Sequence, residues 1–229
     1  MAKKTDNTEE KIHAVEEALS KSEKFIEKNQ KILTIVIGSA VVIVLGVFAF
    51  QKLYIAPREK AAQGQMFMAQ KYFEQDSLAK ALNGDANYPG FLDIIDEYSM
   101  TNAANLANYY TGIIYLKQGK FEDAITYLGK FDSDDEFVGP MATGGIGDAY
   151  MELGQKEKAV EYYVKAANQQ VNDVTTPVFL MRAAFVYEDL GKFDKALEFY
   201  EKIQKEHSKS TEARDIEKYM EAAKVKVAK

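Results

Sequence analysis

One residue pattern occurs three times in this chain, and it constrains the fold more than any other feature. In each copy a small residue is followed by tyrosine three positions on, glycine seven positions on and alanine twelve positions on. The copies begin at Gly112, Gly147 and Ala184, at offsets of 35 and 37 residues. Tetratricopeptide repeats (TPRs) have a period of about 34 residues and consist of two antiparallel helices. The spacing therefore predicts an all-α solenoid with about three clear repeats.

Each position of the pattern has an expected role in packing. The small first residue allows the first helix of a repeat to approach the second. The tyrosine is expected to fill the space between neighbouring repeats, and the glycine to end the first helix at positive φ. The alanine lies on the second helix and allows close packing there, and a larger residue four positions later on the same helix fills the remaining space. The residues concerned are Tyr115, Tyr150 and Tyr187; Gly119, Gly154 and Gly191; Ala124, Ala159 and Ala196; and Leu128, Tyr163 and Tyr200.

Weaker signals flank the three repeats. Residues 94–99 align with residues 203–208, so a helix ending at Tyr98 is expected to be the second helix of a degenerate N-terminal repeat. Its first helix is expected over residues 58–82. Residues 211–228 begin where another first helix would start and are expected to form a capping helix, since solenoid ends need a polar outer face.

The segment Ile32 to Phe50 holds nineteen residues without a charge. A helix of this length spans about 28 Å, close to the roughly 30 Å of a bilayer core. A cleaved signal peptide fits poorly, because the preceding segment is 31 residues long and rich in acidic residues. The sequence predicts a single transmembrane helix. Four lysines precede it and three basic residues follow, which favours a cytoplasmic N-terminus and a solenoid on the other side. They are Lys21, Lys24, Lys28 and Lys31, then Lys52, Arg58 and Lys60.

The leader before the anchor has apolar residues at Ile12, Val15, Leu19 and Ile26, the spacing of one helical face. It is interpreted either as a short partner-docking helix or as a soluble extension of the anchor. The predicted organisation is a short amphipathic cytoplasmic segment over 1–31, a transmembrane helix over 32–50, a connecting helix and degenerate repeat over 51–103, three repeats over 104–209 and a capping helix over 210–229.

In TPR proteins four positions of each first helix line the concave wall. Mapped onto this chain they form an apolar, methionine-bearing surface with an acidic edge, and methionine surfaces adapt to varied partners. We expect a partner-binding groove here; the alternative is that the protein's own helices cover these residues. Changing Met181 and Phe185 together is expected to abolish partner capture and leave helicity intact. The groove positions are Leu106, Tyr109, Ile113, Leu116, Met141, Gly144, Asp148, Met151, Val178, Met181, Phe185 and Glu188.

Other functions find little support in the sequence. The net charge of -6 argues against nucleic acid, and the lack of cysteine excludes disulfides and thiolate metal sites. The acidic run 132–136 lacks the glycine and closing glutamate of a calcium loop. Only Arg182 fits a clamp for acidic chaperone tails. His13 has no metal-ligating companions, and His207 occupies a turn, where a structural role is expected. We expect no enzyme activity, catalytic residue, cofactor, metal or small-molecule substrate.

The order of these parts resembles the YfgM-type proteins of the bacterial inner membrane, as does the stretch NYPGFLDIIDEYSMTNAANLANYYTGIIYLKQGKFEDAI, residues 87–125. The resemblance implies a periplasm-facing scaffold at the SecYEG translocon, with a PpiD-like chaperone and emerging secreted chains as partners. Its function would be to assist the biogenesis of secreted or membrane proteins. The alternative is a membrane-tethered regulatory adaptor that sequesters a stress regulator or organises another envelope complex.

Overall fold

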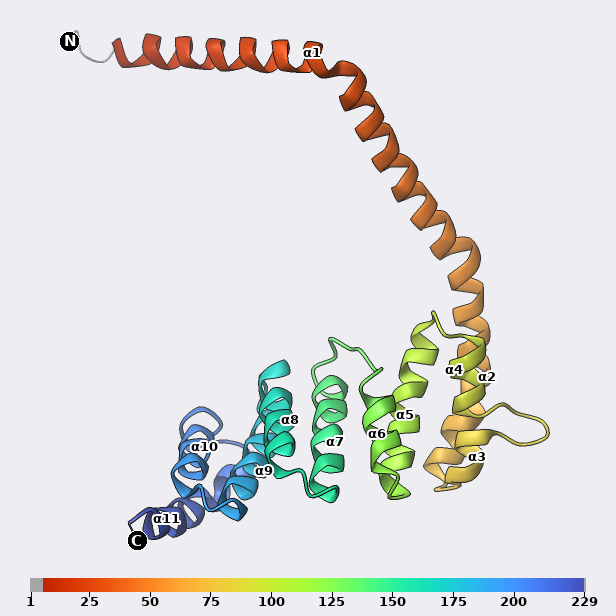
Figure 1. The fold of residues 1–229 in the computed structure, drawn as a ribbon, viewed down its shortest axis with the longest axis vertical. Helices are drawn as coiled ribbons and strands as arrows, with labels where there is room; N and C mark the ends of the chain where they lie inside the picture. The colour runs from red at the N-terminus through yellow and green to blue at the C-terminus, as the bar shows by residue number, and fades with distance from the viewer. Residues whose placement is uncertain (1–5, 229) are drawn as a thin grey trace. The chain divides into compact units, whose positions relative to one another are not determined.

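The computed structural model describes the backbone of residues 6–228 and, before Glu23, only some of the side chains. Throughout this part of the chain, all regular elements are helical (Figure 1). The chain divides into two compact units, Met1–Pro57 and Arg58–Lys229, which are described separately.

The first unit is helical over its described length. Helix α1, Asp6–Phe50, passes into a five-residue π-helix, Gln51–Ile55, in which the Ala56 N–H donates to the Gln51 carbonyl five residues back. The wide turn directly precedes Pro57, which has no N–H to donate and whose ring would crowd an α-helical carbonyl. The proline therefore does not stop the helix, which continues as α2, Ala56–Glu74.

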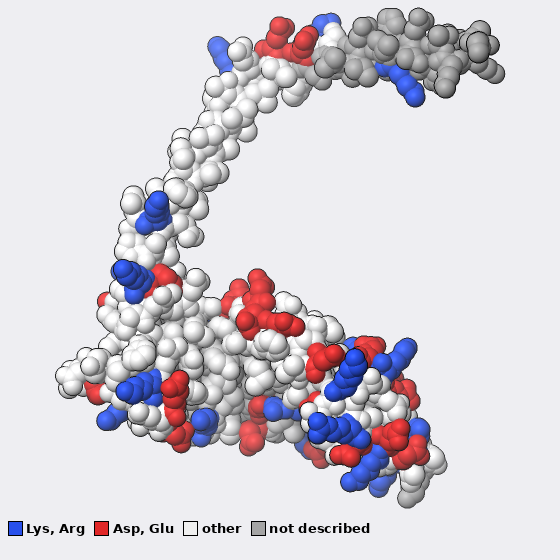
Figure 2. Space-filling view, turned by 180° about the vertical axis from the view of Figure 1, so that it is seen from behind, with Lys and Arg blue, Asp and Glu red and all other residues white. Residues whose placement is uncertain are grey.

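The apolar part of α1 lies open to its surroundings. From Ile32 to Phe50 all side chains are exposed except that of Leu33, which is half-buried. Figure 2 shows this stretch free of charged side chains. By length and composition alone, the stretch Glu23–Glu74 could cross a membrane. In the leader, Ile26 is exposed, and the side chains of Ile12, Val15 and Leu19 lie outside the described residues.

Three helical hairpins in the second unit correspond to the three predicted repeats, and their helices follow one another in chain order (Figure 1). They are α5 and α6, Asn102–Lys117 and Phe121–Leu128; α7 and α8, Val138–Glu152 and Lys156–Gln169; and α9 and α10, Thr175–Asp189 and Phe193–Glu206. A 3₁₀ turn, Glu212–Asp215, leads into α11, Ile216–Val227, whose buried residues Ile216, Met220 and Ala223 complete the last core cluster.

The glycines of the pattern end the first helices as predicted. Gly119, Gly154 and Gly191 have φ of 73°, 70° and 71°. After each glycine, the next N–H donates to the carbonyl of the pattern tyrosine, as in Lys120 to Tyr115 at 2.9 Å. This is the Schellman arrangement, which needs a residue that tolerates positive φ.

A fourth copy of the pattern is present but altered. Helix α2 ends at Glu74, and Asp76 (φ 55°) stands where the other copies have glycine, with Ser77 N–H donating to the Tyr72 carbonyl. The expected continuous helix over 58–82 is therefore wrong. The second helix of this repeat is divided by a loop into α3, Leu78–Asn83, and α4, Phe91–Glu97. The two ends of this loop lie against each other. Their approach is so close that a Cβ on Gly90 would overlap the backbone of Gly84 and Leu82.

Close packing within repeats follows from the small first residues. A Cβ on Gly112 would lie 2.5 Å from Leu128 Cγ, and one on Gly147 would lie 2.7 Å from Tyr163 Cδ1. The pattern tyrosines pack on the core clusters, Tyr150 on two of them as expected for a residue between neighbours, and each also pairs with a ring on the second helix of its own repeat. The centroid distances are 5.4 Å for Tyr115–Tyr127, 5.3 Å for Tyr150–Tyr162 and 5.6 Å for Tyr187–Phe199.

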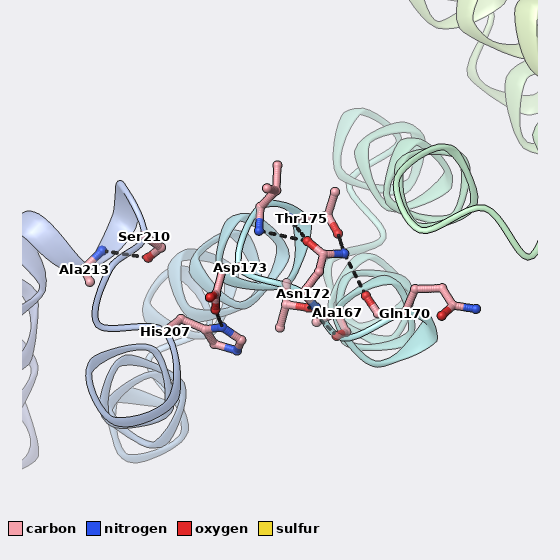
Figure 3. A network of polar contacts seen from close by, with 10 residues as sticks. Ala167, Gln170, Asn172, Asp173, Thr175, His207, Ser210 and Ala213 are labelled. Atoms are coloured by element: carbon pink, nitrogen blue, oxygen red, sulfur yellow. Dashed lines mark hydrogen bonds and ion pairs between the residues drawn. The ribbon is translucent and has the colours of Figure 1, made fainter.

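Polar side chains tie the loops between repeats together. Asn172 Oδ1 accepts the N–H groups of Val174 and Thr175 at 2.8 and 2.7 Å and so caps α9 (Figure 3). His207, 4% exposed, places Nδ1 2.8 Å from Asp173 Oδ1 and joins the loops that follow α8 and α10 (Figure 3). This position agrees with the structural role expected for His207.

Candidate protein-binding groove

A hollow of about 780 Å³ opens beside the first helices of consecutive repeats. Its walls come from the end of α5, the following turn and the first residue of α6, from α7, from one ring on α8 and from α9. The lining residues are Leu116, Lys117, Gly119, Phe121, Asp148, Met151, Glu152, Tyr163 and Arg182. The groove therefore joins parts of three repeats, and no single repeat forms it.

The groove has apolar and polar lining residues. Leu116 and Met151 are both half-buried and pack on the core clusters beneath them. Gly145 lies under Leu116, whose Cδ1 would be 3.3 Å from a Cβ on this glycine. A side chain at position 145 would therefore crowd Leu116 and also the buried Leu128, whose Cδ1 would lie 3.0 Å from the new Cβ. The charged side chains of Lys117 and Glu152 also line the groove.

A charged pair makes the polar wall. The buried Tyr163 hydroxyl donates to Asp148 Oδ1 at 2.7 Å, and Arg182 Nη1 forms an ion pair with the same oxygen. The guanidinium also lies over the rings of Tyr163 and Phe179, at 5.9 and 5.6 Å from their centroids. The cation–π contacts and the ion pair together fix its position.

Burial and the nearby Asp148 carboxylate raise the pKa of Tyr163, so its hydroxyl remains a donor at physiological pH. Burial opposes the charge of Arg182, but the hydrogen bond to Asp148, the negative charge of its carboxylate and the contact with Tyr163 together outweigh burial and raise the pKa of the guanidinium. The wall therefore carries a fixed positive and a fixed negative group side by side.

The structure brings three of the predicted groove residues together in this hollow: Leu116, Asp148 and Met151. Met141 and Phe185 are exposed elsewhere on the first helices, at 45% and 42%. The other predicted positions are half-buried and do not line the hollow; they are Leu106, Tyr109, Ile113, Val178 and Glu188.

Two predicted positions are filled by the core. Met181 is 9% exposed and belongs to a buried cluster with Phe179 and Leu180, so it is unavailable to a partner. Changing Met181 with Phe185 would damage the core as well as the surface. The space at Gly144 is occupied by the Phe179 ring.

Sequence reasoning missed several groove residues: Lys117, Phe121, Glu152, Tyr163 and Arg182. The sequence pattern predicts only a packing role for Tyr163, and for Arg182 only a position in a clamp for acidic tails. A usable signal was present, because Asp148 and Arg182 are opposite charges 34 residues apart, about one repeat length.

The hairpins and their stacking define the class of protein: an all-α protein of TPR-like repeats. Two crystal structures of a Podosopora anserina putative kinesin light chain with nearly identical TPR-like repeats, one of them of a variant, have TM-scores of 0.54. They are 14% and 13% identical in sequence, and each match covers 74% of this chain and 88% of the other. At this identity the likeness shows the fold alone. No curated protein matches the chain.

The family is more specific. The family model of the N-terminal domain of the type VII secretion (T7SS), ESX-1 secretion system protein EccA1 matches residues 17–218. The match spans most of the chain, which therefore belongs to this family.

This membership corrects the sequence interpretation. The YfgM assignment is wrong, and with it the SecYEG translocon and the PpiD-like chaperone as partners. The alternative, a regulatory adaptor, finds no support in the family match either. The error has a physical origin: the repeated residues serve helix packing, and any TPR protein behind an apolar helix shows the same pattern.

Proposed function

We propose that the repeats are a protein-binding module of a type VII secretion system and that the groove holds a protein component of that system. The observation that carries this proposal is the groove itself, with its apolar residues Leu116 and Met151 beside the paired Asp148 and Arg182. Family membership supplies the secretion context. The module acts by binding and performs no catalysis.

Site-specific crosslinking tests the groove. A photoreactive phenylalanine analogue replaces Met151 in the full-length protein in its native membranes, and Glu161, exposed on α8, serves as the control site. We expect secretion-system proteins to crosslink at position 151 and not at 161. Met151→Glu should reduce their recovery at least tenfold, since burying a charge against an apolar partner costs more than the roughly 1.4 kcal/mol that a tenfold change requires. The third repeat already carries Glu188 at the equivalent position, so the helix tolerates this residue. Equal crosslinking at both sites would refute the groove.

We also propose that residues 32–50 anchor the protein in the membrane, with the leader in the cytoplasm and the repeats on the other side. The uncharged composition and exposure of this helix support the anchor. Because the chain has no cysteine, single cysteines at Ser20 and Ser208 report topology without background. A membrane-impermeant maleimide should label Ser208→Cys in spheroplasts and Ser20→Cys only after lysis. Release of the protein by alkaline carbonate would refute the anchor, and the opposite labelling would reverse the orientation.

A further inference from the structure

The Asp148–Arg182 pair stands at a position that other repeats fill differently. One repeat earlier, the residues equivalent to Asp148, Tyr163 and Arg182 are Ile113, Leu128 and Gly145. One repeat later, they are Phe185, Tyr200 and Tyr219. The later set forms an aromatic cluster, with the Phe185 and Tyr219 centroids 5.4 Å apart. The equivalent positions are therefore apolar in one repeat, charged in the next and aromatic in the last.

Asp148 and Arg182 do not use all their hydrogen-bonding groups when they pair with each other. Asp148 uses Oδ1 for both Tyr163 and Arg182, and among the described residues its Oδ2 has no hydrogen-bond partner. A guanidinium has five N–H donors, and only Nη1 of Arg182 bonds to the carboxylate. The two side chains are 40% and 41% exposed, so the pair is within reach of a partner.

Asp148 offers an acceptor and Arg182 offers donors. This combination matches the main-chain peptide unit that every protein has, because its N–H needs an acceptor and its C=O needs a donor. A free carboxylate fits less well, because Asp148 would repel it and partly cancels Arg182. The spacing is also suitable: first helices of neighbouring repeats lie about 8–10 Å apart, the length of about three extended residues. An extended segment can thus place a side chain against Leu116 and Met151 and a peptide unit against the pair.

We propose that Asp148 and Arg182 hold the main chain of an extended partner segment while Leu116 and Met151 receive one of its apolar side chains. This inference rests on the proposed function and specifies what the groove recognises: an extended apolar segment, read through its backbone. Because a backbone contact carries little sequence information, such a groove would accept several segments that share an apolar residue.

The test uses random short peptides displayed on phage, selected on the full-length protein in nanodiscs. A selected peptide is then synthesised with each amide N-methylated in turn. One N-methyl position should weaken binding to the unchanged protein about tenfold or more, since a hydrogen bond to a charged group contributes on the order of 1.5–3 kcal/mol. Asp148→Asn, which keeps an acceptor for Tyr163, should weaken the unmethylated peptide and abolish the effect of that N-methyl group. Arg182→Gln removes donors to the peptide C=O, so it should weaken the peptide and leave the effect of N-methylation in place.

Asp189→Asn is the matched control, because it removes a comparable half-exposed ion pair, Lys156–Asp189, that does not line the groove. If Met151→Glu abolishes binding while N-methylation and both pair variants have no effect, the backbone contact is refuted and the groove stands. The same holds if binding depends on an acidic side chain of the peptide. If no selected peptide is sensitive to Met151→Glu, the proposed function fails with the inference. N-methylation is read on the unchanged protein, so misfolding of a variant cannot mask the result.

Discussion

At the scale of single residues, the glycines of this solenoid do two different tasks that look alike in the sequence. Gly119, Gly154 and Gly191 supply positive φ at a helix end, whereas Gly112 and Gly147 lie in helices and supply only the absence of a side chain. The two tasks predict different responses to alanine, one through backbone strain and the other through overpacking.

Gly147→Ala should lower the free energy of unfolding by about 1–3 kcal/mol, because the new Cβ would press on the buried Tyr163 ring. Gly64→Ala is the matched control: this helical glycine has nothing within 4 Å of its Cβ position. The control should be neutral or stabilising by up to about 1 kcal/mol, since alanine favours helices. Urea unfolding of both full-length variants in detergent measures the difference, and equal midpoints would contradict the close-packing role of Gly147.

Asp135 makes the start of α7 sensitive to pH. Its carboxylate accepts the Val138 and Phe137 N–H groups at 2.8 and 2.9 Å, and these bonds lower the pKa of the carboxyl below its usual 3.8. A pKa lowered by folding means that the stabilisation is present above the usual pKa and is lost as pH falls through the lowered value. Carbon-13 NMR of the Asp135 carboxyl should show this pKa. Asp135→Asn keeps an acceptor and should remove the dependence; a pKa at or above 3.8 would contradict the cap.

At the scale of elements, the degenerate repeat shows what an insertion does to a helical hairpin. Ala81 and Ile94 of α3 and α4 correspond to Ala196 and Ile203 of α10, but six more residues separate them. The extra residues form the loop between Gly84 and Gly90, held by Tyr72 Oη donating to Asp85 at 2.6 Å. The second helix of this repeat is thus interrupted and then resumed.

Deleting residues 84–89 should therefore join α3 and α4 into one continuous helix. We expect the free energy of unfolding to change by no more than about 1 kcal/mol, because shortening a surface loop changes its closure entropy little. Hydrogen exchange should reveal new protection at residues 82, 83 and 90–92, which the deletion joins. Deleting three residues of the same loop is the control, because it would rotate α4 off its face and should destabilise the repeat. Loss of cooperative unfolding in the six-residue deletion would refute the split-helix interpretation.

The sequence predicted the three clear repeats because spacing and residue size alone determine them. It predicted the helix that ends near Tyr98 but missed the break between α2 and α3, since Asp76 replaces the signature glycine and the insertion lengthens the spacing to 43 residues. The groove was only partly predictable. Helical position gives the face of a residue but not its depth, so the buried Met181 and the accessible Met151 looked equivalent.

At the scale of the whole molecule, each helix of the repeats packs mainly on its neighbours in the chain. Stability in such a solenoid is approximately a sum of local terms, so damage at one end stays near that end. Packing residues do not identify the proteins that a solenoid binds. The family match therefore corrected the predicted partners.

Removing α11 by a stop after Ser210 should expose Tyr200 and Ile203, which are fully buried. Hydrogen exchange should accelerate in α9 and α10 and remain nearly unchanged in α5, because α11 contacts α10 and not the first repeats. Ala222→Ser, at an exposed position of α11, is the control and should change neither region. Uniform loss of protection throughout the repeats would show that the solenoid unfolds as one unit.

Packing between neighbours also gives the repeats a mechanical property. A force applied at the two ends of a globular core acts on all its contacts together, but here it acts on one interface at a time. The repeats should therefore extend under low force, and each hairpin should be able to open and close again while the others stay folded. A groove built across three repeats changes its width when the repeats are stretched, so tension on the chain would alter its grip on whatever it holds.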